Sequence, residues 1–323
     1  MLTHLCGDNA RRMEGAHERW FDSVPEEMKL RLPDGTLLHD TAIIPNFCES
    51  VLGLKHDKIW HSLSELSHFE GSEAIPLGNG DNPQWVRGSH PALHYRGNDI
   101  TRNKVWFQTG FDDGMRKYGY TGWQWMIAGA THRVESVPAV AELGKAINEK
   151  LGLQRPHDHW IATGYNDGSQ CIGPHSDKTR DWRSDSCFVV VKFGAKRRFE
   201  FTWDEPAVAE AKAALKRAER KKDKPVIKIA KAALSAAIKN RKYAEVFYSK
   251  ILPAGAGVIV GVAANALVKH GVPAENEEEK CGPSGSIVAR SIATVVPWSA
   301  VADEQRKRGA KADVAMSDAA SYV

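Results

Sequence analysis

The sequence predicts a mainly β core, an antiparallel β-sandwich or jelly roll, with an N-terminal helical layer and a helical insertion, within the α+β class. A single well-marked helix is expected at residues 136–152, and an Ala- and Lys-rich segment at residues 206–250 is expected to form two more helices. Otherwise the second half of the chain is a series of β-branched and aromatic runs, divided by Gly, Asn, Asp and Ser turns. These runs lie at residues 159–165, 186–194, 197–203, 256–262 and 286–298.

Residues 1–40 are polar and mixed without a clear period, which predicts an N-terminal arm or an irregular entry segment. Residues 41–60 predict a short strand, a turn at Pro45 and a helix, and the Gly-, Pro- and Asn-rich stretch 71–97 predicts a loop. We expect one domain over residues 41–298, followed by an Ala- and charge-rich tail at residues 299–323.

The helix at residues 136–152 has the clearest signature. Pro138 suits the first turn, and Gly152 suits the end. One apolar stripe runs between them through Val140, Leu143, Ile147 and Leu151.

The predicted insertion at residues 206–250 supplies the basic character of the protein. It holds thirteen Lys and Arg against four Asp and Glu, a balance of +9, while the whole chain has a net charge of +4. Pro225 breaks the segment into two helices. Its charge favours contact with the phosphates of DNA or RNA, and the alternative is a solvated helical hairpin without a partner.

Composition narrows the class of protein. No run of about eighteen apolar residues predicts a membrane span, so we expect no membrane contact, and the N-terminus has no apolar secretory segment. The five cysteines are scattered and form no C-x-x-C pair. They predict reduced thiols in an intracellular protein of the cytoplasm or the nucleus.

The stretch GPHSDKTRDW, residues 173–182, contains the pair His175 and Asp177. His270 follows an apolar strand-like run and could supply a third metal ligand. Two imidazoles and one carboxylate hold Fe(II) without filling its coordination sphere. Arg290, in the strand-like run beyond His270, could bind the carboxylate of an anionic cosubstrate.

Four motifs in this order resemble those of the AlkB-like Fe(II)/2-oxoglutarate-dependent dioxygenases. They are TGYNDGSQCIGPHSDKTRDW, SCFVVVKFGAKRRFEF, LVKHGVP and ARSIATVV, and the earlier segment NKVWFQTGFDDGMRKYGYTGW resembles the part of that family that carries a substrate-facing aromatic lid. The resemblance spans roughly residues 41–298 without the insertion. It implies a double-stranded β-helix (jelly roll) that oxidises a methyl or alkyl group on a base of DNA or RNA.

The resemblance also implies roles for particular residues. His175, Asp177 and His270 would bind Fe(II), and Arg290 would pair with the distal carboxylate of 2-oxoglutarate. Tyr165 would hydrogen-bond the same cosubstrate. Thr163 would lie beside it, while Tyr118 and Tyr120 would cover a flipped base.

Three positions differ from the pattern of the family. Thr163 stands where an asparagine is common, and Val296 stands where a second arginine is common. Lys178 and Thr179 follow the metal-binding aspartate, at positions near the substrate where repair enzymes often carry a carboxylate. A carboxylate would favour a cationic base lesion, so these residues favour a neutral modified base.

Other functions remain open from the sequence. One is 5-methylpyrimidine oxidation, as in the related TET/JBP-like enzymes, and another is the same oxygenase chemistry on a protein or a small molecule. A third belongs to a different class: a nucleic-acid-binding module with an inactive oxygenase core.

Overall fold

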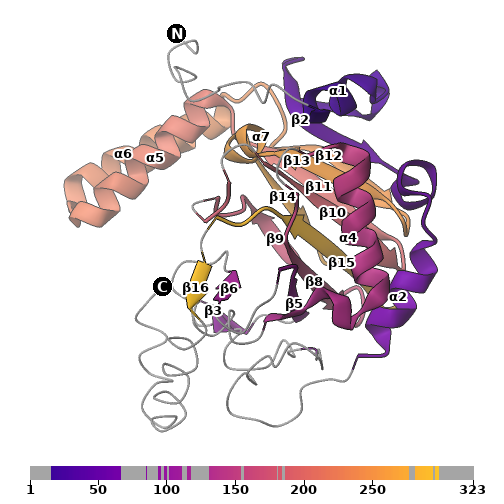
Figure 1. Ribbon diagram of the computed structural model, residues 1–323. Coiled ribbons are helices and arrows are strands. Elements are labelled where there is room, and N and C mark those ends of the chain that lie inside the picture. The colour runs from indigo at the N-terminus through magenta and orange to yellow at the C-terminus, as the bar shows by residue number, and fades with distance from the viewer. Residues whose placement is uncertain are drawn as a thin grey trace, which may run out of the picture.

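Two mainly antiparallel sheets face each other in the computed structural model and form the core of the protein (Figure 1). The structure describes residues 16–66, 85, 94–95, 98–99, 102–110, 115–117, 131–153, 156–179, 181–183, 186–275, 281–293 and 295–297. The large sheet has eight strands, in the order β1 (Lys29–Arg31), β2 (Leu37–Ile44), β13 (Gly257–Gly261), β10 (Cys187–Gly194), β15 (Ser284–Arg290), β8 (His159–Tyr165), β5 (Asn103–Gln108) and β7 (Thr131–Arg133). The small sheet has four, in the order β12 (Val246–Leu252), β11 (Arg197–Trp203), β14 (Val268–Val272) and β9 (Ile172–His175).

The strand order identifies the core as a double-stranded β-helix. From β8 to β15 the chain passes back and forth between the sheets, so β8, β10, β13 and β15 lie in the large sheet and β9, β11, β12 and β14 in the small one. All pairings among these eight strands are antiparallel. The predicted jelly roll is therefore confirmed.

A helical layer covers the outer face of the large sheet, as expected (Figure 1). It consists mainly of α2 (His56–Ser64) and α4 (Pro138–Leu151), with a π-helical segment, η3 (Phe47–Leu52), alongside. The predicted stripe on α4 is buried, Pro138 begins the helix, and Gly152 ends it in the left-handed conformation at φ 55°. Gly144 permits the close approach of α4 to the sheet, because a Cβ there would lie 2.7 Å from the ring of Trp160.

The two faces of the large sheet belong to two apolar clusters. Val105, Trp160 and Val189 pack with the helical layer. Phe188 and Val190, which alternate with Val189 on β10, pack between the two sheets with residues of β11 and β14. A side chain's place in this alternation therefore says whether it faces the helices or the interior of the sandwich.

The N-terminal segment differs from the expected irregular arm. Residues 16–40 contain α1 (Ala16–Ser23), a short 3-10 turn at Glu26–Met28, β1 and the start of β2. Phe21, Leu30 and Leu38 are buried. Short apolar contacts with the sheet order this stretch even though it has no periodic pattern.

The insertion forms the two expected helices, α5 (Pro206–Lys221) and α6 (Lys224–Lys239), which project from the body as a hairpin (Figure 1). Asp223 accepts a hydrogen bond from the Val226 backbone N–H and caps α6. The insertion is shorter than expected, because residues 246–250 already belong to β12.

The remaining described elements are small. A helix, α7 (Val262–Leu267), joins β13 to β14, and a 3-10 turn spans Val134–Ser136. Two strand pairs lie outside the sandwich: β6 (Met115–Lys117) with β16 (Val295–Pro297), and β3 (His94–Tyr95) with β4 (Asn98–Asp99).

Two negative findings apply to the described part of the chain. Its helices include none that is long and apolar enough to span a membrane. The cysteines within these ranges, Cys48, Cys171, Cys187 and Cys281, are free thiols. The expected loop at residues 71–97 falls mostly outside the described residues, and the expected tail at residues 299–323 lies wholly outside them.

Candidate metal centre

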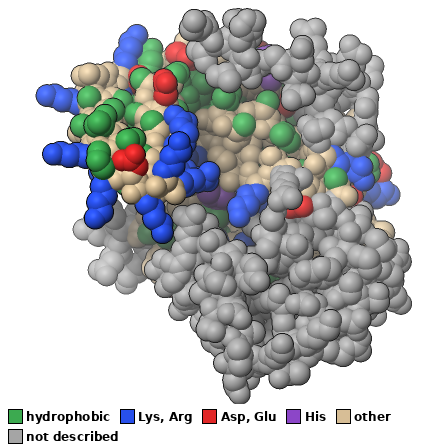
Figure 2. Space-filling model, turned by 90° about the vertical axis from the view of Figure 1, so that its left-hand side faces the viewer, with side chains coloured by type: hydrophobic (Ala, Val, Ile, Leu, Met, Phe, Trp, Pro, Cys, Tyr) green, Lys and Arg blue, Asp and Glu red, His purple; other side chains and the backbone are tan. Residues whose placement is uncertain are grey.

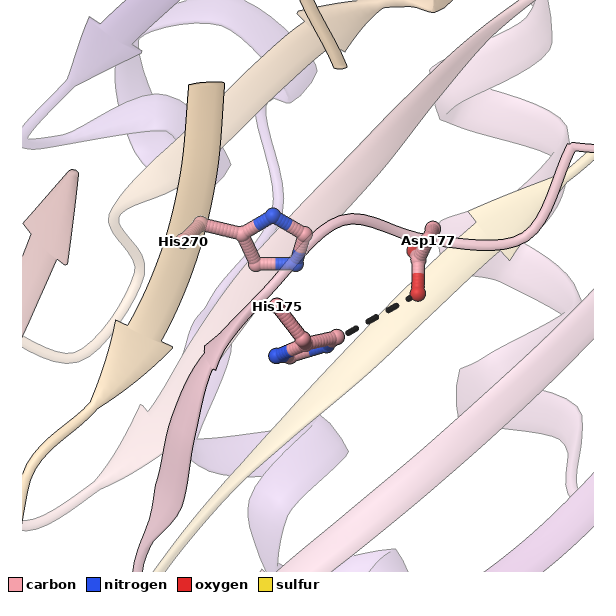
Figure 3. A group of neighbouring side chains, drawn as sticks. All are labelled: His175, Asp177 and His270. Carbon is pink, nitrogen blue, oxygen red and sulfur yellow. Dashed lines mark ion pairs between the residues drawn. The ribbon is translucent and has the colours of Figure 1, made fainter. Parts of the chain in front are cut away.

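His175, Asp177 and His270 come together at the small sheet, although 93 residues separate Asp177 from His270 (Figure 3). One potential ligand atom from each residue lies within 4.8 Å of the other two. No other such group of three His, Cys, Asp or Glu side chains occurs among the residues that the structure describes. The structure thus brings together the three residues that were predicted to bind the metal.

Strand pairing brings the two imidazoles together. His175 ends β9 and lies directly opposite His270 on β14, with 4.4 Å between the ring centroids. Gly271 makes this approach possible, because a Cβ at that position would lie 2.9 Å from the Ile172 carbonyl oxygen. The HGV segment therefore combines the ligand with the small residue that its neighbouring strand requires.

Hydrogen bonds from α7 fix the backbone of Asp177. The Asp177 N–H donates to Asn265 Oδ1, and Asn265 Nδ2 donates back to the Asp177 carbonyl oxygen, each at 2.9 Å. Asn265 is buried. The neighbouring Ser176 hydroxyl donates to the Val268 carbonyl oxygen at 2.9 Å. The loop after β9 is thus fastened to the strand that carries His270.

The carboxylate of Asp177 is shared between two partners. Arg290 Nη2 donates to Oδ2 at 2.7 Å, whereas Oδ1 lies 3.7 Å from His175 Nε2. Both the Asp177 and the Arg290 side chains are almost fully buried, so this charge-assisted bond is shielded from water. It leaves Oδ1 directed towards the imidazoles (Figure 3).

The protonation states suit metal binding. Burial lowers the pKa of His270 to about 3, and it also lowers the pKa of His175, so both rings are neutral at pH 7. Burial raises the pKa of Asp177, but the charge of the Arg290 guanidinium and the hydrogen bond that it donates outweigh burial and hold that pKa below its usual value. Two neutral imidazoles and one ionised carboxylate form a donor set that fits a divalent transition metal.

The surroundings of the triad are apolar on one side and open on another. Phe188, Phe199 and Phe201 surround the His270 ring at centroid distances of 5.2–6.4 Å. The His175 side chain is 34% exposed, whereas that of Asp177 is 6% exposed. The three phenylalanine rings therefore close the centre on the side of His270, and the centre is accessible to solvent beside His175. His175 Nδ1 lies 2.9 Å from the Gly173 carbonyl oxygen. Because a carbonyl oxygen only accepts, this contact favours the ring with the proton on Nδ1 and with Nε2 free to bind a metal.

The two predicted cosubstrate residues Arg290 and Tyr165 lie at opposite ends of the β8–β15 pair. Arg290 is opposite His159, whereas Tyr165 is opposite Ser284, six residues earlier on β15. Six residues of strand correspond to about 20 Å. Thr163 is opposite Ser286, between these ends, and faces the interior of the sandwich with Tyr165.

The remaining predicted residues are those expected near the substrate and Val296. Lys178 and Thr179 directly follow Asp177, and the Thr179 carbonyl oxygen accepts a hydrogen bond from the Trp182 backbone N–H. Val296 lies on β16, opposite Arg116. The predicted lid residues, Tyr118 and Tyr120, lie outside the described residues.

Several polar residues beside the triad or in the interior of the sandwich were missed by the sequence analysis. Asn265 is one, and Lys104 and Lys192, on the interior face of the large sheet, are others. A signal for Lys192 was present, since a lysine inside the apolar run CFVVVKF can hardly reach solvent. The sequence gives no such signal for Asn265, because the role of this residue depends on a contact with Asp177, 88 residues away in the chain.

No family model matches this chain, and no curated protein matches it. Among solved structures, OsALKBH1 is similar over 78% of this chain and 96% of its own length, with 12% identity and a TM-score of 0.41. A bsmA homologue from Methylobium petroleophilum PM1 is similar over 78% of this chain and 88% of its own length, with 10% identity and a TM-score of 0.36. Both likenesses are loose, so the assignment of the fold rests on the strand order and register of this chain.

Proposed function

We propose that this protein is an Fe(II)/2-oxoglutarate-dependent dioxygenase that oxidises a methyl or alkyl group on a base of DNA or RNA. The observation that carries the proposal is the cluster of His175, Asp177 and His270 at the open side of a double-stranded β-helix. Two neutral imidazoles and one carboxylate leave coordination positions free, as an oxygenase requires and a structural zinc site does not.

Each residue around the triad has a supporting role in this proposal. Arg290 holds the outer oxygen of the Asp177 carboxylate, and Asn265 holds the backbone of the same residue. Phe188 and Phe199 keep water from the inner side of His270. A bound Fe(II) would supply the O₂ chemistry that no side chain provides. The overall reaction would convert 2-oxoglutarate, O₂ and a C–H bond to succinate, CO₂ and a hydroxylated product.

The helical hairpin supports a nucleic acid as the substrate. Lys and Arg side chains project from it in several directions (Figure 2). Among them, Lys216, Lys221, Lys224 and Lys228 on α5 and α6 form no ion pair within the described residues. Such a projecting basic element suits contact with a phosphate backbone.

The proposal is tested by mass spectrometry of nucleosides. Genomic DNA and total RNA are incubated with the protein, Fe(II), 2-oxoglutarate and O₂, and the His175→Ala variant serves as the control. We expect one modified nucleoside to decrease with the wild type only, accompanied by equimolar succinate. Succinate formation without a change in any nucleoside would move the substrate to proteins or small molecules. An absence of succinate from metal-loaded protein would overturn the dioxygenase assignment.

A further inference from the structure

The interior face of the large sheet carries a patch of hydroxyl groups on β8 and β15. Two cross-strand rows make up this patch. In the first, Tyr165 on β8 lies opposite Ser284 on β15, and in the second, Thr163 lies opposite Ser286. We call these four residues the hydroxyl floor.

Cations stand at both edges of the hydroxyl floor. On one side, β5 pairs with β8 so that Lys104 lies opposite Thr163, and Arg102, two residues earlier, lies on the same face as Lys104. On the other side, β10 pairs with β15 so that Lys192 lies opposite Ser286. The second row therefore continues across four strands with a lysine at each end.

The groups of the floor are not fully satisfied within the described part of the chain. The Ser284 hydroxyl is completely buried and has no hydrogen-bond partner there, and neither has Arg102 Nε. Lys192 is 1% exposed. Its ammonium group makes one long hydrogen bond, of 3.3 Å, to the Gly285 carbonyl oxygen. Buried donors without acceptors cost free energy, and an anion placed among them would accept from several at once.

The local charge balance points to the same kind of ligand. Arg102 and Arg290 both act electrostatically on Lys104, with Asp177 as the opposing carboxylate. Burial, with Arg102 and then Arg290, lowers the pKa of Lys104 to about 7. Lys192 is opposed by the Glu275 carboxylate but also faces Arg197, and burial followed by Arg197 lowers its pKa to about 7 as well. Both lysines would regain their usual charge if an anion were bound.

We propose that the hydroxyl floor, with Lys104 and Arg102 on one edge and Lys192 on the other, binds the second carboxylate of the dicarboxylate cosubstrate whose 2-oxo-acid end faces the metal centre. This inference rests on the proposed function and assigns the distal carboxylate to different cations from the one that the sequence predicts. Arg290 is engaged with Asp177 through a 2.7 Å bond, at the far end of β15 from Tyr165. The floor keeps Tyr165 and Thr163 in the roles predicted for them.

The position of the floor suits a short, linear dicarboxylate. The row of Thr163 and Ser286 lies four residues from Arg290 along β15, or about 13 Å, and a lysine side chain spans part of that distance. Lys104, at the β5 end of this row, is coupled electrostatically to both Asp177 and His175. In this proposal a molecule bound at the metal by one end would place its other carboxylate at Lys104.

The test compares two 2-oxo acids that differ in the second carboxylate. Calorimetry measures the binding of 2-oxoglutarate and of 2-oxobutyrate to protein loaded with Co(II), which replaces Fe(II) and is stable in air. We expect the wild type to bind 2-oxoglutarate at least about 30-fold more tightly than 2-oxobutyrate, since a charge-assisted hydrogen bond contributes that order of affinity. Lys104→Met and Lys192→Met should each remove about 10-fold or more of this preference and leave 2-oxobutyrate binding unchanged.

Two further variants keep the experiment decisive. Ser284→Ala removes a hydroxyl that has no partner in the described structure, so the fold is retained while 2-oxoglutarate affinity falls several-fold. Lys250→Met removes an exposed lysine from β12, at the edge of the small sheet, and should change nothing. Circular dichroism confirms that each variant is folded.

The outcomes separate this inference from the proposed function. Metal-dependent binding of 2-oxoglutarate with unchanged affinity in Lys104→Met, Lys192→Met and Ser284→Ala would overturn the inference alone. So would a weakening of oligonucleotide binding in these variants without any effect on 2-oxoglutarate, since the cations would then contact phosphates of the substrate. Wild-type protein that binds Co(II) but neither 2-oxo acid would overturn the inference and the proposed function together.

Discussion

At the scale of single residues, the two oxygens of the Asp177 carboxylate have different partners. Its Oδ2 accepts a bond from Arg290, and its backbone is held on both sides by Asn265. Only Oδ1 remains directed towards the two imidazoles. A ligand fixed by its own neighbours loses little conformational entropy when a metal binds, which is why such supporting bonds raise metal affinity.

Replacing Arg290 by methionine should therefore weaken metal binding. The variant keeps the length and apolar stem of the side chain but leaves Asp177 without its charged partner, so its carboxylate can turn away and its pKa rises. We expect the dissociation constant for Co(II) to increase about 10- to 100-fold, measured by calorimetry at pH 7.5. Arg31→Met, at an exposed arginine of β1 paired with Glu26, is the matched control. An unchanged Co(II) affinity in Arg290→Met would show that Asp177 is held well enough without it.

The pKa of His270 predicts how the metal-free protein responds to acid. The ring faces His175, Asp177 and Arg290, and its pKa of about 3 in the folded state lies below the value of about 6.5 expected in the unfolded chain. The unfolded state therefore binds more protons between these values, so stability is complete above pH 6.5 and declines as the pH falls. At pH 5 the loss amounts to about 2 kcal/mol from this residue.

Denaturant unfolding of chelator-treated protein at pH 7.5 and pH 5 measures this loss. His270→Phe, which suits the surrounding aromatic rings, should reduce the difference between the two pH values by the same amount. If the variant loses as much stability between pH 7.5 and pH 5 as the wild type, the titration of His270 in the folded state is not the cause.

At the scale of elements, the sequence predicted the strands that form long apolar runs. β8 and β11 coincide with their predicted runs, and β10 does so within one residue. The strands that carry the metal ligands were harder to predict, because IGPH and VKHGV are short and contain glycine or proline. They are strands because they pair with each other and with β11, a long-range property that local propensity does not contain.

The same distinction applies to the candidate site. The ligands His175, Asp177 and His270 could be predicted because their residue types and order form a pattern. Tyr165 and Thr163 of the hydroxyl floor were also predicted. Their neighbours Ser284, Ser286 and Lys192 could not be, since they join the floor only through the register of β8, β15 and β10. Polar residues within apolar runs were the available signal, and it identifies positions but not partners.

Removing the helical hairpin should separate nucleic-acid binding from the oxygenase core. Few of its side chains are buried, chiefly Val208, Ala218 and Ala230, and it lies between two adjacent strands, β11 and β12. Replacing residues 206–240 by a short Gly/Ser linker should therefore leave Co(II) affinity unchanged. We expect oligonucleotide affinity to fall at least about 10-fold at 0.1 M salt, with a shallower dependence on salt concentration.

Fluorescence anisotropy with a labelled oligonucleotide at several salt concentrations measures this effect. Ile229→Ser, which alters an exposed apolar side chain of α6 without changing its charge, is the control. Equal affinity and equal salt dependence in the deletion variant would identify the hairpin as a solvated element without a role in nucleic-acid binding.

At the scale of the whole molecule, the metal centre joins the two sheets. His175 and His270 belong to the small sheet, whereas Arg290, which holds Asp177, ends a central strand of the large sheet. Between them the interior of the sandwich holds polar and charged groups, including Lys192 and Ser284, where apolar packing would otherwise stabilise the fold. Apolar packing therefore stabilises the sandwich least where these polar groups lie.

Metal removal should accordingly lower the stability of the entire domain. A metal that binds only the folded state stabilises it by about 2.7 kcal/mol at one hundred times its dissociation constant. For a chain of this size, that corresponds to a rise in Tm of roughly 5 °C, measured by calorimetry with Co(II) and with excess chelator. His175→Ala should unfold at the same temperature in both conditions, because it lacks one of the three ligands.

Since Arg290 links the ligands to the large sheet, hydrogen exchange should slow in β15 as well as in β9 and β14 when Co(II) is added. Protection confined to β9 and β14 would mean that the metal stabilises the small sheet alone, and that the Asp177–Arg290 bond does not couple the two sheets.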